Sequence, residues 1–169
     1  MTMTSEPLVI NGWTLLAHPL FLDQVATLTA RVERLAAKDP TGYRSRPATK
    51  RLAAIIKLTT HDIPQDPAGD HYRQGKTLGS EYTHWRRAKF YQQYRLFFRY
   101  DLASRIIVYA WVNDETAKRA FDSKSDAYVT FSRMLDSGNP PDSWQTLQQA
   151  ALAQADRATL LLNKPDDPD

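Results

Sequence analysis

Hydrophobic residues in the first third of the chain recur with the period of a helix. They lie three or four positions apart, at Phe21, Val25, Leu28, Val32 and Leu35. This spacing predicts an amphipathic helix that begins at Pro19 and ends near Asp39-Pro40. After a turn at Gly42, a second helix opens at Ser45-Arg46-Pro47, since Pro is tolerated in the first turn of a helix. Its buried face is predicted to hold Leu52, Ile55, Ile56 and Thr59. Two helices with a short connection predict a helical hairpin.

Four segments favour β-strands. Residues 8–16 form a first strand in which Gly12 fits a bulge. Residues 84–91 and 94–100 are two strand-like runs joined by Gln92-Gln93, and residues 105–111 form a run rich in β-formers. Residues 62–80 carry two Pro and three Gly without periodicity, which predicts a long loop.

The last third of the chain is predicted to be helical. Residues 114–121 resemble a helical turn or two, and residues 126–135 a short helix with Phe131 and Leu135 inward. One final helix begins at Pro140-Pro141, with a stripe formed by Trp144, Leu147, Ala151, Ala158 and Leu162. The fold class is therefore α+β: an N-terminal helical hairpin on a mainly antiparallel sheet, with extra C-terminal helices. We expect a single domain over residues 1–163 and a disordered acidic tail over 164–169.

Positive charge is concentrated in one segment. The net charge is +3 and the isoelectric point about 9.2, yet residues 71–105 contain eight Lys or Arg against two acids. Strand side chains alternate between faces, so Arg87 and Lys89 share one face of their run, and Arg95 and Arg99 share one face of the next. If the runs pair, four cations stand on one sheet surface. Such a surface suits a polyanion, with RNA or DNA foremost.

Several kinds of chemistry lack the residues they need. The chain has no cysteine, which excludes disulfides and fits a reducing cytoplasm. It shows neither a membrane-spanning apolar run nor a signal-peptide pattern, so we expect a cytoplasmic protein without membrane contact. The four histidines have no metal-binding spacing and no carboxylate cluster accompanies them, so we expect no metal and no cofactor. Gly75-Lys76-Thr77 lacks the first glycine of a phosphate-binding loop.

Metal-free cleavage of RNA is the chemistry that remains. The ribose 2′-hydroxyl can attack its own phosphodiester, given a base, cations for the charge on phosphate and an acid for the leaving 5′-oxygen. A cluster of Arg and Lys can supply all three roles. A plainer interpretation stays open for each residue: Arg87 and Lys89 also suit a solvated strand face, His84 a surface histidine and Tyr128 a packing residue.

The chain resembles the YhaV toxin family of PrlF–YhaV toxin–antitoxin systems, within the RelE-like superfamily. The resemblance covers most of the chain through the order and spacing of short motifs. These are Asn11-Gly12-Trp13, Ala17-His18-Pro19, Lys38-Asp39-Pro40, Ala48-Thr49-Lys50, Gly75-Lys76-x-Leu78-Gly79, Tyr94-Arg95-Leu96-Phe97-Phe98-Arg99-Tyr100, Trp111-x-Asn113-Asp114-Glu115, Lys124-x-Asp126-Ala127-Tyr128-x-x-Phe131-Ser132-x-Met134-Leu135 and Pro140-Pro141-x-x-Trp144. The resemblance implies a RelE-like fold whose antiparallel sheet carries a basic concave face.

The resemblance also implies the site residues. Arg87-x-Lys89 matches a Lys-x-Lys pair of RelE-like enzymes, with Arg in place of the first Lys, which shifts the role of base toward Lys89. Arg95, in the Tyr-Arg-Leu motif, inherits the role of phosphate ligand. Tyr128, with Lys124 before it, matches the C-terminal tyrosine, so either is the candidate acid. Additional RNA contacts are expected from Arg73, Lys76, His84, Arg86 and Arg99.

The function implied is that of a type II toxin, an endoribonuclease that cleaves mRNA, often on the ribosome. Its cognate antitoxin would be PrlF-like, of the AbrB/MazE type, and operator DNA would be reached only through the antitoxin complex. The alternatives are a non-catalytic inhibitor of the RelE/ParE kind and a module that only binds RNA. The endoribonuclease hypothesis predicts that Arg87, Lys89 and Arg95 point to one solvent-open face.

Overall fold

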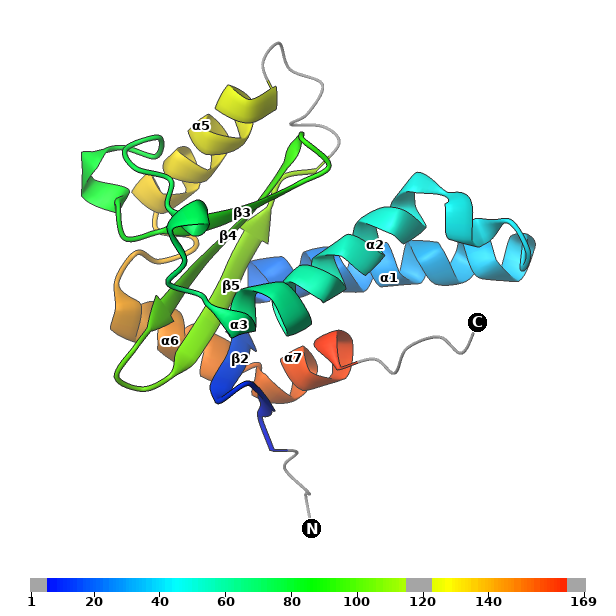
Figure 1. Ribbon diagram of the computed structural model, residues 1–169, viewed down its shortest axis with the longest axis horizontal. Helices are drawn as coiled ribbons and strands as arrows, with labels where there is room; N and C mark the ends of the chain where they lie inside the picture. Colours follow the sequence, from blue (N-terminus) through cyan, green and yellow to red (C-terminus); the bar gives the residue numbers. More distant parts are fainter. Residues whose placement is uncertain (1–5, 115–122, 164–169) are drawn as a thin grey trace.

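A five-stranded sheet with helices on both faces forms the protein (Figure 1), as seen in a computed structural model that describes residues 6–114 and 123–163. The strand order is β1-β2-β5-β4-β3. The strands are β1 (Leu8–Ile10), β2 (Trp13–Ala17), β3 (Arg86–Phe90), β4 (Tyr94–Asp101) and β5 (Ile106–Val112). The helices are α1 (Pro19–Lys38), α2 (Pro47–Lys57), α3 (Ile63–Gln65), α5 (Ser123–Asp136), α6 (Trp144–Leu152) and α7 (Ala155–Leu162). The α+β class is confirmed.

The sheet is antiparallel except where β2 runs parallel to β5. The single strand expected over residues 8–16 is wrong, because the chain reverses at Asn11-Gly12 and β1 pairs with β2 as a hairpin. Both turn residues have positive φ, 53° and 82°, as a tight hairpin turn requires, and Asn-Gly is the sequence that adopts this conformation most readily. The hairpin turns β2 into the sheet interior, where Leu15, Leu16 and Ala17 are buried.

Helices α1 and α2 lie side by side as a helical hairpin (Figure 1), and α1 also packs on β5. Their apolar faces join the sheet residues Leu15, Leu96, Phe98 and Tyr109 in one core. The start and end of α1 agree with the periodicity. The second helix does not stop at Lys57: it continues through a π-helical turn at Leu58–Asp62 into α3. Part of the loop expected over residues 62–80 is therefore helical.

The opposite face of the sheet is covered by α5 and α6. Phe131 and Leu135 are buried there, as predicted. Phe131 stacks on Phe97, with ring centroids 4.3 Å apart, and on Trp111, at 5.7 Å. This aromatic stack anchors α5 over β4 and β5, beside the row of cations that the sequence placed on β3 and β4.

The single final helix that the stripe predicted is wrong, because the chain forms α6 and α7. Leu147 and Ala151 of α6 belong to the core under α5, whereas Ala158 and Leu162 of α7 belong to the core under α1. The break near Ala153 lets the chain pass from one face of the sheet to the other. A helical stripe gives the same signal whether its residues serve one core or two.

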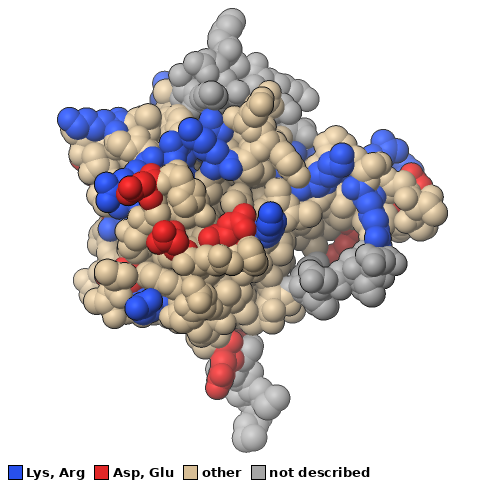
Figure 2. Space-filling model, in the orientation of Figure 1, with Lys and Arg blue, Asp and Glu red and all other residues tan. Residues whose placement is uncertain are grey.

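The two ends of the sequence and the segment 115–122 lie outside the described residues, so the helical turn expected over 114–121 and the disordered tail over 164–169 stay predictions. No helix in the described part combines the length and the hydrophobicity needed to cross a bilayer. Lys and Arg gather over β3 and again over the helical hairpin (Figure 2).

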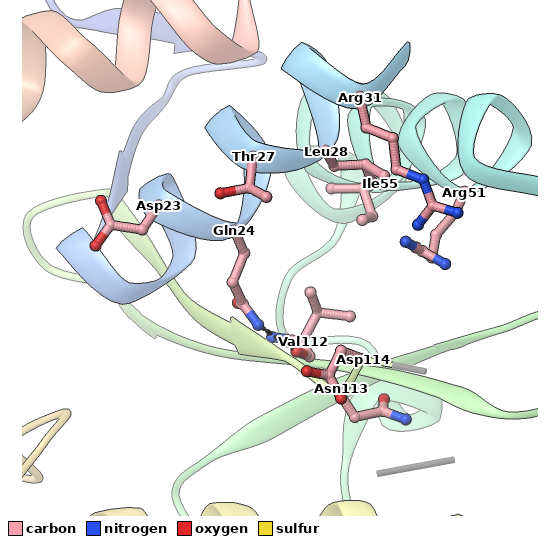
Figure 3. A pocket seen from close by; sticks show the side chains of 10 residues that line it. All are labelled: Asp23, Gln24, Thr27, Leu28, Arg31, Arg51, Ile55, Val112, Asn113 and Asp114. Atoms are coloured by element: carbon pink, nitrogen blue, oxygen red, sulfur yellow. Dashed lines mark hydrogen bonds between the residues drawn. The ribbon is translucent and has the colours of Figure 1, made fainter. Parts of the chain in front are cut away.

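The far end of β5 extends beyond its partner β2 and is held by α1 instead. The Gln24 side chain donates to the carbonyl of Val112 at 2.6 Å and accepts from its amide at 3.1 Å (Figure 3). This pair of bonds completes the ladder where a strand is missing. It fixes Asn113, which follows, against the turn between β3 and β4.

Candidate active site

Arg87 and Lys89 of β3 share one face of the sheet with Arg95 of β4, as the alternation predicted. In the antiparallel register Arg87 lies opposite Phe97, and Lys89 lies opposite Arg95. Phe97 belongs to the core under α5, so all four side chains point to the face that α5 partly covers. The β3–β4 pairing therefore brings Arg87, Lys89 and Arg95 together.

Helix α5 delivers Tyr128 to Arg87. The guanidinium Nε of Arg87 donates to the Tyr128 hydroxyl at 2.9 Å, and its Nη1 donates to the carbonyl of His71, also at 2.9 Å. The Tyr128 ring stands edge-on to Phe97, with centroids 5.7 Å apart. Two residues that lie 41 positions apart in sequence are thus in direct contact. The His71 carbonyl fixes the arginine, and the Phe97 ring fixes the tyrosine.

Arg87 and Lys89 line a cleft of about 720 Å³ at the outer edge of β3, called here the β3 cleft. Its other lining residues are Leu58, Asp62, Gln65, Asp70, His71, Tyr72, Arg73 and Ala88. Lys89 is exposed and Arg87 half-buried. The lining combines cations, carboxylates and an imidazole, a combination that can hold a phosphate and exchange protons.

His71 and Asp62 are cleft residues that the sequence analysis missed. Neither belongs to a motif, and both lie in segments without periodicity, so no sequence signal singled them out. Tyr72 beside them is buried, and this burial, with Asp62 and Asp66, raises the pKa of its phenol to about 12. Tyr72 therefore stays protonated and is not a base at neutral pH.

Arg95 corrects the expectation of a fully solvent-open cluster, because only 2% of its surface is exposed. Its Nη1 donates to the carbonyls of Gln92 and Tyr94, at 2.8 and 2.9 Å, and its backbone amide donates to Asn113 at 2.7 Å. The strand alternation predicts that the Arg95 side chain is solvated. Here the turn folds over it and supplies backbone acceptors, so Arg95 holds the turn between β3 and β4.

Arg99 and His84 are engaged within the protein at Asp142. The Arg99 guanidinium lies over the rings of Trp85 and Trp144, at 5.6 and 5.5 Å, and donates to the Asp142 carbonyl. Burial lowers its pKa, an effect that Asp142 and Asp101 oppose. His84 Nε2 lies 2.6 Å from the Asp142 carboxylate. Both residues tie the sheet and the turn before β3 to the segment before α6, and the RNA contacts expected of them stay predictions.

The remaining expected contacts divide between the two faces. Arg86 points to the opposite face, where its guanidinium lies over Tyr100 at 5.6 Å, so it does not join Arg87. Arg73 and Lys76 are exposed in the loop before β3, and Arg73 lines the β3 cleft. Lys124 lies in the first turn of α5, and its side chain is outside the described part of the structure.

Within the described residues no three His, Cys, Asp or Glu side chains converge as they would around a metal ion. Asp62, Asp70 and His71 line the β3 cleft without forming such a group.

Comparisons with known proteins identify the family of this chain. A family model described as a toxin with endonuclease activity, of a toxin–antitoxin system, matches residues 15–152. Ribonuclease toxin YhaV of Escherichia coli K12 is 44% identical over 143 residues, which cover 83% of this chain and 93% of that protein. Toxin YhaV of Escherichia coli O6:H1 is 43% identical over 145 residues, with 85% and 94% covered. No solved structure matches significantly. The chain therefore belongs to the YhaV toxin family.

Proposed function

We propose that this chain is the toxin of a type II toxin–antitoxin system and cleaves mRNA as a metal-independent endoribonuclease. The observation that carries the proposal is the contact, at 2.9 Å, of Tyr128 with Arg87, a residue that lines the β3 cleft together with Lys89. Similarity to a protein named ribonuclease toxin YhaV supports RNA as the substrate. The sheet flanked by a helical hairpin is compatible with the RelE-like superfamily.

The reaction is an internal transfer at phosphorus. The 2′-oxygen of ribose attacks the adjacent phosphorus and loses its proton to a base, while the bond from phosphorus to the 5′-oxygen breaks and that oxygen takes a proton from an acid. The products are a 2′,3′-cyclic phosphate and a 5′-hydroxyl. No water and no metal ion enters the balance.

We assign the roles from the residues that line the cleft and from their contacts. Arg87 is the phosphate clamp, because a guanidinium stays charged and offers several donors. Tyr128, whose oxygen already accepts from Arg87, is the acid that the described residues offer, and Lys124 is the alternative. Lys89 is the base or its electrostatic partner, with His71 in the same cleft as a second proton acceptor. Arg95 acts as a positioning residue through the β3–β4 turn.

The partners follow from the family. We infer a PrlF-like antitoxin of the AbrB/MazE type as the inhibitor, mRNA associated with the ribosome as the substrate, and contact with operator DNA only through the antitoxin complex. The exposed wall of the β3 cleft, with Lys89 and Arg73, is a surface that an acidic inhibitor segment and an RNA phosphate could both occupy.

The test is cleavage of end-labelled RNA by the pure protein in excess EDTA. We expect activity to persist and to leave 2′,3′-cyclic or 3′-phosphate ends, and Arg87→Ala to lose roughly 10² to 10³ in rate, the usual loss of a transition-state contact. Arg133→Ala, which removes an exposed arginine of α5 away from the cleft, is the matched control. Products with 5′-phosphates, or activity lost with EDTA, would exclude this mechanism. Binding without any product would favour the non-catalytic alternative.

A further inference from the structure

A second hollow lies between α2 and the turn that joins β3 to β4. Its volume is about 390 Å³, and it is called here the α2 groove. It is lined by Ser45, Pro47, Lys50, Arg51, Tyr91, Gln93 and Tyr94. None of these residues belongs to the proposed catalytic group or to the RNA contacts expected from the sequence.

Tyr91 stands at the rim of the α2 groove as an exposed aromatic residue. It lies in the turn after β3, and 56% of its surface is exposed. Its φ of 47° and that of Gln92, 62°, are both positive, a conformation that side chains other than glycine seldom adopt. Its hydroxyl donates to the carbonyl of Lys50 at 3.2 Å, which tethers the turn to α2. The ring is thus held at the groove instead of being packed into a core.

Two cations, Lys50 and Arg51, line the groove together with Tyr91. Lys50 and Arg46 at the start of α2 are exposed. The guanidinium of Arg51 lies over the Tyr94 ring at 5.5 Å and donates to its hydroxyl at 3.3 Å. Residues 31–57 contain eight Lys or Arg against two acids, a second basic region that equals the one on the strands. Exposed aromatic rings interleaved with cations are the features by which proteins hold single-stranded RNA.

The α2 groove and the β3 cleft are lined by residues from the two ends of the same helical segment. Helix α2 contributes its first turns to the groove, and the residues directly after its end, Leu58 and Asp62, line the cleft. On the other side, β3 contributes Lys89 to the cleft, and Tyr91 follows two residues later. The 11 residues of α2 span about 16 Å. A strand of RNA leaving the cleft along α2 reaches the groove.

We propose that the α2 groove is a second RNA-binding subsite, which holds the single-stranded segment next to the scissile step. Tyr91 stacks on a base, and Lys50 and Arg46 contact phosphates. The inference rests on the proposed function, because it takes the β3 cleft as the place of the scissile phosphate. It adds that recognition extends several nucleotides to one side of that phosphate.

The test is binding of 2′-O-methyl RNA, which cannot be cleaved by 2′-hydroxyl attack, in lengths of about two, four and eight nucleotides. Affinity of the wild-type protein should rise with length. Tyr91→Ala should bind the longest oligonucleotide roughly tenfold more weakly, toward the lower end of what base–aromatic stacking contributes. Lys50→Ala should weaken binding by a similar factor through the loss of a phosphate contact. Their ratio of affinities between the longest and the shortest oligonucleotide should fall by the same factor. Tyr91→Phe, which keeps the ring, should retain the wild-type ratio.

Lys38→Ala is the matched control, because it removes an exposed lysine of the same hairpin that does not line the groove. It should keep the wild-type length dependence, and circular dichroism should show every variant folded. Wild-type affinity of Tyr91→Ala and Lys50→Ala at all lengths would overturn the subsite. Variants that keep wild-type RNA affinity but lose antitoxin binding would also overturn the subsite, because the groove would then be a protein-docking surface. Length-dependent binding of the 2′-O-methyl RNA, together with no cleavage of unmodified RNA by the same protein, would sink the proposed function alone.

Discussion

Arg95 is a buried cation whose hydrogen bonds go to backbone carbonyls. Removing its side chain leaves the Tyr94 carbonyl without this partner and opens space beneath the turn. We expect Arg95→Ala to lower the free energy of unfolding by about 1–3 kcal/mol, the usual cost of an unsatisfied buried polar group. Lys89→Ala, which truncates the exposed residue opposite it, should change stability by less than about 0.5 kcal/mol.

Urea denaturation of both variants measures this difference. Loss of cleavage in Arg95→Ala with unchanged stability would restore the role of direct phosphate ligand. Loss of both together would fit a positioning residue that holds the β3–β4 turn.

His18 couples the stability of α1 to pH. It caps the helix, since its Nδ1 accepts from the Leu20 amide at 3.1 Å, and burial lowers its pKa, with Asp23 acting in the opposite direction. A lowered folded-state pKa means that the unfolded chain takes up the proton first. The contribution of His18 to stability is therefore complete above the unfolded-state pKa of about 6.5 and is lost as pH falls toward the folded-state value.

We expect His18→Asn, which keeps a capping side chain, to flatten the fall in unfolding free energy between about pH 7 and pH 5. Denaturant titrations across that range, on wild type and variant, give the difference directly. An identical slope in both proteins would mean that another group causes the acid sensitivity.

At the scale of elements, Arg99 joins the β-sheet to the entry of α6. Its guanidinium lies over the ring of Trp85, just before β3, and over the ring of Trp144 at the start of the helix. It donates to the Asp142 carbonyl, and the Asp142 carboxylate binds the side chains of His84 and Trp85. Each desolvated cation–π contact contributes about 0.5–2 kcal/mol. We expect Arg99→Ala to destabilise the protein by about 2 kcal/mol and to leave RNA affinity close to wild type.

Tryptophan fluorescence during unfolding reports on this contact, because both flanking rings are tryptophans. Arg99→Lys keeps the charge but loses the planar stacking group, so it should recover only part of the stability. A variant that is fully stable but weak in RNA binding would return Arg99 to the group of RNA contacts.

Some elements were predictable because one local rule decided them. The 3.6-residue period fixed α1, and the alternation of side chains placed Arg87 and Lys89 on one face. Other features depend on partners distant in sequence. The acceptors of Arg95 are backbone carbonyls of a turn, so the alternation pattern alone predicts a solvated side chain. Arg99 and His84 bind Asp142, which lies far along the chain and leaves no local signal. The cleft residue His71 belongs to no motif.

At the scale of the whole molecule, charge is distributed so that a small net value conceals two basic regions. The net charge is +3, yet residues 31–57 and residues 71–105 each carry eight Lys or Arg against two acids. Figure 2 shows the same separation, with Lys and Arg over β3 and over the helical hairpin. Local charge, not net charge, therefore governs contact with a polyanion.

This distribution predicts that RNA affinity falls steeply with salt concentration and that particular residues cause the fall. Each phosphate neutralised on a single strand contributes a slope of about −0.7 in a plot of log affinity against log salt. We expect Lys89→Ala in the β3 cleft and Lys50→Ala in the α2 groove each to flatten the slope by about 0.7, and the double variant by the sum, since the two contacts bind separate phosphates. Titrations of non-cleavable RNA at several salt concentrations give these slopes. Lys38→Ala, which makes the same change in net charge, should leave the slope unchanged. If the control flattened it equally, binding would come from the diffuse field of the protein, and neither hollow would hold a defined phosphate.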